Sequence, residues 1–374
     1  MKRIIIFLAI TFGITFCLEF GLLYPLFLVA DPNPTFTFVF QLLMSTMMFI
    51  PALGALLTRL ISNEGLRQAM IKPQGKGQAV KYFLIAWFGP AALTTLGAIL
   101  YFCLNPADFD PAMATYKASL ASQMQAASPN TTLSEATIGM IGPIQLVVAV
   151  LFSPILNSIF CFGEEWGWRG YLVPKLNERL SFIPTVLISG VIWGLWHAPL
   201  INLGHNYGFG YPGYPWLSIA AMCLFCVVLG TLFSYLTIKT HSCLPAVIGH
   251  GAVNGFASAP LLFSLSGGDS FIGPLPVGLV GGSAFIVTAL IICVRMRKDP
   301  GFKTPASVPD APPVHSAGRP DPADLDSFLG AVGPLVGTDH STGIDGYRIT
   351  TDDDLYVITS PSSNKSINHI LHGA

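Results

Sequence analysis

Long apolar stretches separated by short polar connections dominate the first 298 residues of the chain. About 20 apolar residues are enough for a helix to cross the hydrocarbon core of a bilayer. Eight such stretches occur, and we predict a transmembrane helix over each. Their ranges are Ile4–Val29, Phe36–Ile61, Tyr82–Leu104, Gly142–Phe162, Phe182–Leu203, Trp216–Ile238, Leu244–Leu265 and Phe271–Val294. The predicted fold is an all-α polytopic membrane protein with about eight transmembrane helices.

Basic residues fall on alternate connections between these predicted helices. Lysine and arginine concentrate in the cytoplasmic loops of membrane proteins, so this alternation orients the chain. One set of connections holds Lys2, Arg3, Arg59, Arg67, Lys72, Lys76, Lys81, Arg169, Lys175, Arg179, Lys239, Arg295, Arg297 and Lys298, and the other holds Lys117. We predict cytoplasmic termini and an external loop, Asn105–Thr137, with a short surface helix over Ala112–Ala127. The first stretch lacks a small-residue cleavage site before Glu19, which favours a retained helix over a signal peptide.

Composition supports a membrane protein and excludes a nucleic-acid partner. The 374 residues are 52% apolar and 10% charged, whereas soluble domains are roughly 25% charged. The net charge of −1 gives no basic field that would attract nucleic acid, so we predict membrane lipid as the surrounding partner. All seven cysteines lie in or beside apolar stretches, which favours small hydrophobic residues over a disulfide framework. The oligomeric state is left open by these features.

The composition changes after Val294. Residues Asp299–Asp324 are rich in Pro, Ala, Asp and Ser, which predicts a linker or disordered cytoplasmic tail over 299–374. Apolar and β-branched residues alternate within Gly346–Thr359, a pattern compatible with a small hairpin. The predicted organisation is therefore a membrane domain over 1–298 followed by this tail.

Several ionisable or amide side chains fall inside the predicted helices. Such groups are costly at membrane depth unless they are paired or solvated, so they mark a functional site by default. They are Glu19, Glu164, Glu165, Arg169, His197 and His250, together with Asn157 and Asn254. Glu19 has no polar partner near it in the sequence, whereas the others fall at similar depths.

The depth of these groups follows from their distance to a predicted turn over Asn177–Ser181. Glu164 lies about 14 residues before this turn and His197 about 17 after it, which places both roughly 20–25 Å from the helix ends. Two antiparallel helices would bring them level. His250 and Asn254 are four residues apart on a third helix and therefore face the same way. Glu165 and Arg169 have the same spacing, so they can neutralise one another while Glu164 faces His197.

This combination of groups suits the activation of a water molecule. A desolvated carboxylate can act as a general base, a neighbouring histidine can share the proton, and an imidazole with an amide can donate to an oxyanion. Each group taken alone is more often a satisfied core residue, and Glu165 with Arg169 could be a clasp between helices. The convergence of Glu164, His197, His250 and Asn254 at one depth favours a site.

Three ordered motifs in this region resemble those of the CPBP family, the CAAX prenyl proteases and bacteriocin-processing enzymes related to the type II CAAX prenyl endopeptidase. The first is Glu164-Glu165-x-x-x-Arg169 followed by Gly170-Tyr171. The second is Trp193-x-x-x-His197-Ala198-Pro199, and the third is His250-x-x-x-Asn254. The resemblance extends over about residues 142–260. The second motif of the family usually has Phe where Trp193 stands.

The resemblance implies an intramembrane endopeptidase that hydrolyses a membrane-associated, prenylated or bacteriocin-like peptide or protein substrate. By position, Glu164 and His197 would activate water, while His250 and Asn254 would bind the oxyanion. Glu165 and Arg169 would be supporting residues. Glu164, His197 and His250 are also residue types that bind zinc, so a mechanism with a divalent metal and a metal-free glutamate mechanism both fit.

One alternative comes from a different functional class. A non-catalytic membrane protein, such as a bacteriocin-immunity or scaffold protein, could keep the same fold. A transporter would be expected to show related halves, and the sequence shows none. Short loops favour a bacterial inner-membrane protein, where prenylated substrates are not expected. The physiological substrate and cleavage site cannot be derived from these residues.

Overall fold

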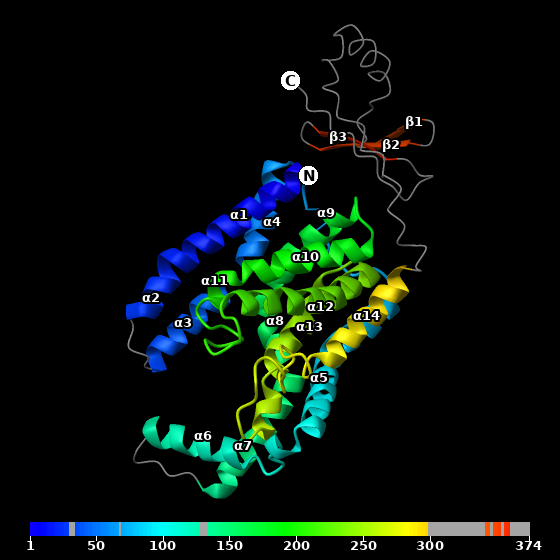
Figure 1. The fold of residues 1–374 in the computed structure, drawn as a ribbon. Coiled ribbons are helices and arrows are strands. Elements are labelled where there is room, and N and C mark those ends of the chain that lie inside the picture. The colour runs from blue at the N-terminus through cyan, green and yellow to red at the C-terminus, as the bar shows by residue number, and fades with distance from the viewer. Residues whose placement is uncertain are drawn as a thin grey trace. The chain divides into compact units, whose positions relative to one another are not determined.

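The computed structural model describes residues 1–29, 34–66, 69–127, 134–297, 341–344, 347–352 and 355–359. The chain divides into two compact units, residues 1–306 and 307–374. In the described part of the first unit the regular structure is helical, apart from isolated bridges such as Phe109 with Ser264 (Figure 1). The all-α prediction is therefore confirmed for this unit.

Fourteen α-helices follow one another along the described part of the first unit. They are α1 (Lys2–Leu18), α2 (Tyr24–Val29), α3 (Pro34–Met47), α4 (Ile50–Ile61), α5 (Lys76–Leu104), α6 (Ala114–Ala127), α7 (Glu135–Leu151), α8 (Ser153–Gly167), α9 (Val173–Asn177), α10 (Phe182–Trp196), α11 (Ala198–Ile201), α12 (Trp216–Thr240), α13 (Leu244–Phe256) and α14 (Ser283–Arg297). Two π-helical segments, Glu19–Leu23 and Trp168–Leu172, join α1 to α2 and α8 to α9. The predicted surface helix is confirmed as α6.

Several helical stretches are long and apolar enough to cross a membrane. Among the described residues there are five of them: Lys2–Leu28, Thr35–Ile61, Ala79–Leu104, Trp216–Thr240 and Leu244–Phe263. A sixth span is possible where α7 meets α8 and α9, because these two helical stretches pass the same test together despite a 52° bend. The chain is accordingly an integral membrane protein by the length and composition of its helices.

The prediction of about eight spans is therefore confirmed in part. Helix α10 is apolar, but its 15 residues are shorter than a membrane span. The predicted helix over Phe271–Val294 is helical only from Ser283 onward. The preceding segment contains Gly273, Gly278, Pro274 and Pro276, and residues of these two types disfavour helix interiors.

Small residues let the helices that carry the polar motifs approach closely. A Cβ atom added to Gly190 of α10 would come within 2.5 Å of the Cα of Val227 in α12. A Cβ added to Gly251 of α13 would likewise lie 2.5 Å from the carbonyl oxygen of Pro154 in α8. Glycine at such contacts is typical of membrane helix packing. These two contacts fix the spacing of α10 with α12 and of α8 with α13.

The described part of the second unit is a three-stranded antiparallel sheet. Its strands are β1 (Ser341–Ile344), β2 (Tyr347–Asp352) and β3 (Leu355–Thr359), in the order β1-β2-β3. The pairing of β2 with β3 falls in the range that the sequence indicated for a hairpin, whereas β1 was not predicted. The predicted linker over Asp299–Asp324 lies outside the described residues.

Glu64, in the connection between α4 and α5, joins three segments of the first unit. Its Oε1 accepts a hydrogen bond from the Tyr171 hydroxyl at 2.9 Å and lies 3.4 Å from the Arg3 Nε. Its Oε2 lies 2.9 Å from the Nζ of Lys175. Burial raises the pKa of Glu64, but hydrogen bonds from Lys175 and Tyr171 outweigh it and hold the pKa below its usual range.

This lowered pKa predicts a pH-dependent contribution to stability. A carboxylate with a lowered folded pKa stabilises the fold above its unfolded pKa of about 4.3, and the stabilisation is lost as pH falls through the folded value. We expect Glu64→Gln to lower the melting temperature near neutral pH and to differ less from wild type below pH of about 4. Thermal melts of both proteins between acidic and neutral pH test this prediction, and Glu178→Gln, at an exposed position, is the control. Equal melting temperatures at neutral pH would contradict the prediction.

Candidate active site

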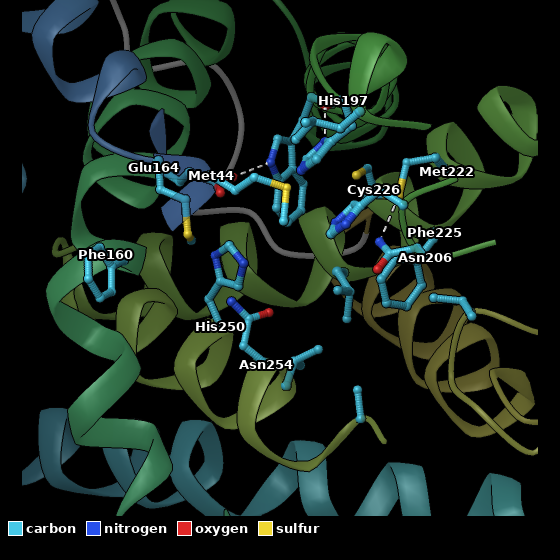
Figure 2. A pocket seen from close by; sticks show the side chains of 18 of the residues that line it. Met44, Phe160, Glu164, His197, Asn206, Met222, Phe225, Cys226, His250 and Asn254 are labelled. Carbon is cyan, nitrogen blue, oxygen red and sulfur yellow. Dashed lines mark hydrogen bonds between the residues drawn. The ribbon is translucent and has the colours of Figure 1, made fainter. Parts of the chain in front are cut away.

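The predicted catalytic residues line one cavity of about 430 Å³. Glu164 comes from the end of α8, His197 from the junction of α10 with α11, and His250 and Asn254 from α13. Figure 2 shows His250 and Asn254 side by side on one helix, with Glu164 and His197 contributed by other elements. The structure therefore brings together four residues that span 90 positions of the chain, as the depth argument predicted.

The turn between α9 and α10 produces this convergence. Helix α9 ends at Asn177 and α10 begins at Phe182, which confirms the predicted turn. Asn157 in α8 holds α13 alongside, because its Nδ2 donates to the carbonyl of Gly251 at 3.3 Å as well as to that of Ser153 in its own helix at 3.1 Å. The last turn of α8 is thereby placed against the part of α13 that carries His250.

Trp193 in α10 contacts the acidic and the basic residues of the site. Its indole Nε1 donates to the Oε2 of Glu164 at 2.6 Å. Its ring centroid lies 5.9 Å from that of His197 and 5.5 Å from that of His250. The guanidinium carbon of Arg169 lies 4.0 Å from the centroid of the same ring, a distance typical of a cation–π contact. The sequence indicated only an aromatic wall at this position.

Glu164 and His197 are held by different partners and are not hydrogen-bonded to each other in the described structure. The Nδ1 of His197 lies 2.8 Å from the carbonyl oxygen of Trp193. Because a carbonyl only accepts, this nitrogen carries a proton, and the Nε2 of a neutral ring is left as an acceptor. The prediction that Glu164 is free to face His197 is thus revised, since the Trp193 indole occupies one carboxylate oxygen.

Glu165 is the centre of a buried charged network beneath the cavity. Its Oε1 lies 3.0 Å from the NH1 of Arg169 and 2.9 Å from the Nδ1 of His250. The pairing with Arg169 was predicted from their spacing, whereas the contact with His250 was not. Glu165 and Arg169 are not among the residues that line the cavity. The Asn254 Nδ2 contacts the Sγ of Cys161 at 3.6 Å, a weak interaction that leaves this amide available.

Comparison with known proteins finds a family that matches part of this chain. Residues 142–256 match the family model described as type II CAAX prenyl endopeptidase Rce1-like. The chain carries a domain of this family. A segment of 109 residues is also 31% identical to CAAX prenyl protease 2 of Methanococcus maripaludis, covering 29% of this chain and 39% of that protein. The chain thus matches about two fifths of the length of this curated relative.

The matched range contains all the predicted site residues. Glu164, the first of the predicted catalytic residues, and Asn254, the last, both fall within the matched residues 142–256. This range is close to the predicted extent of about 142–260. The match therefore covers the part of the chain that carries the site, and less than half of its length.

Part of the cavity wall was not predicted from the sequence. Residues of α3, Met48 directly after it, and residues of the loop after α11 complete the cavity. They include Gln41, Met44, Ser45, Met47, Met48, His205 and Asn206. Phe160, Met222 and Phe225 add apolar surface, and Figure 2 shows the last two on the same side as Asn206. Gln41, the one amide side chain within the apolar stretch Phe36–Ile61, was the available signal for this wall.

Glu19 does not belong to this site. It lies in the first π-helical segment, is 1% exposed, and does not line the cavity. Neither of its carboxylate oxygens has a hydrogen-bond partner among the described residues. Its neighbour along α1, Thr15, accepts a 2.8 Å hydrogen bond from the Nε1 of Trp196.

The alternative mechanism with a divalent metal can be compared with the geometry of the site. Within the part of the chain that the structure describes, no three His, Cys, Asp or Glu side chains are grouped so that they could hold a metal ion. Glu164, His197 and His250 each have one polar atom in contact with a protein group. These groups are the Trp193 indole, the Trp193 carbonyl and the Glu165 carboxylate, respectively. In this arrangement these three residues do not form a set of ligands for one metal ion.

Proposed function

We propose that the chain is an intramembrane endopeptidase that uses Glu164 to activate a water molecule. The observation that carries the proposal is the convergence of Glu164, His197, His250 and Asn254 on one cavity within the matched domain. The substrate class is a membrane-associated peptide or protein, which includes bacteriocin-like peptides. The mostly apolar walls of the cavity suit such a substrate.

The carboxylate of Glu164 and the free Nε2 of His197 are the two proton acceptors of the proposed mechanism. Water attacks the carbonyl carbon of the scissile peptide bond and transfers a proton to Glu164. The C–N bond then breaks, and the proton passes to the leaving amine, so the base ends in its starting form. The fixed Nδ1 proton of His197 keeps its Nε2 in the accepting tautomer.

His250 and Asn254 supply the donors of the proposed oxyanion site. The Nδ1 of His250 donates to Glu165, and in the imidazolium form the Nε2 of the ring is a second donor, which can serve the oxyanion. The amide of Asn254 lies one helical turn further on the same face of α13 and gives up only a weak contact with Cys161. Glu165 and Arg169 act through His250 and are therefore positioning residues.

The role of the Trp193 indole can be tested by removing its N–H. We expect Trp193→Phe to lower the cleavage rate about tenfold or more, because a hydrogen bond to a charged group is worth about 1.5–3 kcal/mol. The substitution also leaves a buried carboxylate oxygen without its donor, so rates are compared per folded molecule. Trp196→Phe is the matched control, since the Trp196 indole donates to Thr15 rather than to Glu164. Equal rates for Trp193→Phe and wild type would remove Trp193 from the mechanism.

The decisive experiment is a cleavage assay. Purified protein is incubated with a library of membrane-associated peptides, and products are identified by mass spectrometry for the wild type and for Glu164→Gln. Cleavage by the wild type alone supports the proposed function. Cleavage that a chelator abolishes and zinc restores would instead support the metal-dependent alternative.

We also propose a bacterial inner-membrane location with cytoplasmic termini and an external Asn105–Thr137 loop. The alternation of basic residues along the chain supports this topology. A reporter fused after Lys298 is expected to be active only on the cytoplasmic side. Activity only on the outer side would contradict the proposed orientation.

A further inference from the structure

A second cavity, of about 270 Å³, lies where the beginning of α1 meets α9 and the residues after it. Four cationic side chains line it: Lys2, Arg3, Lys175 and Arg179. Glu178 is the one carboxylate in the described lining. This cavity shares no residue with the proposed active site and has no part in the proposed cleavage.

The cationic wall of this cavity is held in place by a buried carboxylate. Glu64, whose side chain is 7% exposed, lies 2.9 Å from the Nζ of Lys175 and 3.4 Å from the Nε of Arg3. Lys175 is itself only 11% exposed and also pairs with Glu178 at 3.1 Å. Because Arg3 contacts Glu64 through its Nε, its two terminal nitrogens remain available to an anion.

Two further cations have no ion-pair partner among the described residues. They are Lys2 and Arg179, both exposed, and they line the same cavity. A carboxylate that fixes two cations, with two more left unpaired, gives a preorganised site with excess positive charge. Terminal guanidinium nitrogens match the geometry of phosphate oxygens and can bind them in pairs.

The position of the cavity along the helices identifies the source of the phosphate. Lys2 begins the candidate span Lys2–Leu28, and Asn177 ends the helix that carries Lys175. The cavity therefore lies at the ends of membrane helices, where lipid head groups are found. Ile5, in the next turn of α1, is 60% exposed and offers apolar surface to an acyl chain.

We propose that this cavity binds the phosphate of an anionic phospholipid head group. Arg3, Lys2 and Arg179 contact the phosphate oxygens, while Lys175 stays paired with Glu64 and Glu178. Basic pockets at the ends of membrane helices are suited to anionic head groups. This proposal does not depend on the proposed protease activity, and either can fail without the other.

The test measures lipid affinity of the full chain in detergent. Phosphatidylglycerol is titrated against wild type and the double variant Lys2→Ala with Arg179→Ala, and binding is followed by native mass spectrometry and melting temperature. Each basic residue near an anionic surface is worth about fivefold in affinity, so the double variant should bind roughly 25-fold more weakly. Phosphatidylcholine, which has no net charge, should raise the melting temperature of neither.

The matched control removes two exposed basic residues that do not line the cavity, Arg295 and Arg297 at the end of α14. Arg295→Ala with Arg297→Ala should keep wild-type affinity for phosphatidylglycerol. Equal losses in the two double variants would indicate general attraction of basic residues and overturn the proposal. If inorganic phosphate alone raises the melting temperature as much as phosphatidylglycerol does, the assignment of the cavity to a lipid head group is overturned.

A second variant keeps the test independent of the exposed cations. Glu64→Gln leaves all four cations in place but releases Lys175 and Arg3 from their anchor. It should weaken phosphatidylglycerol binding at a temperature where the protein is folded, although the net positive charge has increased. Tighter binding of phosphatidylglycerol by Glu64→Gln would show that net charge alone decides the affinity, and it would overturn the proposal of a preorganised site.

Discussion

Glu164→Gln is expected to reduce peptide cleavage at least roughly a hundredfold, the lower range for loss of a general base. The amide oxygen can still accept the hydrogen bond from Trp193, so the side chain keeps its place in the cavity. It can no longer take a proton from water. Replacing a buried carboxylate by a neutral amide also removes the cost of burying a charge, so we expect no loss of stability.

The measurement compares initial cleavage rates of purified wild type and Glu164→Gln on one substrate from the peptide library, at equal concentrations of folded protein. Glu178→Gln is the control, because this exposed residue follows the end of the same helical stretch and does not line the active-site cavity. If the folded Glu164→Gln protein cleaves at the wild-type rate, the catalytic interpretation fails. The non-catalytic immunity or scaffold alternative would then take its place.

Hydrophobic pattern alone predicted most helices of this fold, because a membrane span must be both long and apolar. It predicted helices that are too long where glycine and proline residues interrupt the helix. The apolar stretch that begins at Phe271 is interrupted by Gly and Pro up to Gly282, and helix α10 ends before Pro199. Hydropathy does not distinguish an apolar loop from an apolar helix, so these limits needed the structure.

Spacing within the chain predicted which site residues share a helix face and which lie at equal depth. It correctly placed Glu164, His197, His250 and Asn254 on one cavity and paired Glu165 with Arg169. Contacts between helices depend on their rotation about their own axes, which spacing does not determine. For this reason the sequence did not predict the Trp193 bond to Glu164 or the contact of His250 with Glu165.

The contact with His250 sharpens what is expected of Glu165. Its carboxylate faces Arg169 at 3.0 Å and His250 at 2.9 Å, and the Arg169 and Glu165 side chains are 3% and 0% exposed. Its Oε2 has no hydrogen-bond partner in the described structure. A glutamine at position 165 must place its NH₂ group at one of the two oxygen positions. At the Oε1 position it would face the Arg169 cation, and at the Oε2 position it would have no hydrogen-bond partner. Both arrangements are unfavourable.

Glu165→Gln is therefore expected to lower the free energy of unfolding by about 3–5 kcal/mol, the cost of leaving one member of a buried ion pair without its partner. Activity should fall mainly through the yield of folded protein, and the folded fraction should lose oxyanion stabilisation because a neutral amide is a weaker acceptor for His250 than a carboxylate. Denaturant unfolding in mixed micelles measures the first effect, and cleavage per folded molecule measures the second.

Glu164→Gln is the matched control for this stability measurement, because it makes the same chemical change at the adjacent position of α8. Glu164 has no buried cation as a hydrogen-bond partner, so its replacement should leave the unfolding free energy near the wild-type value. The double variant Glu165→Gln with Arg169→Met removes both charges, and it should be more stable than Glu165→Gln alone because no cation is left unpaired. If Glu165→Gln is as stable as Glu164→Gln, the pair with Arg169 contributes no stability, and Glu165 would act on cleavage through His250 alone.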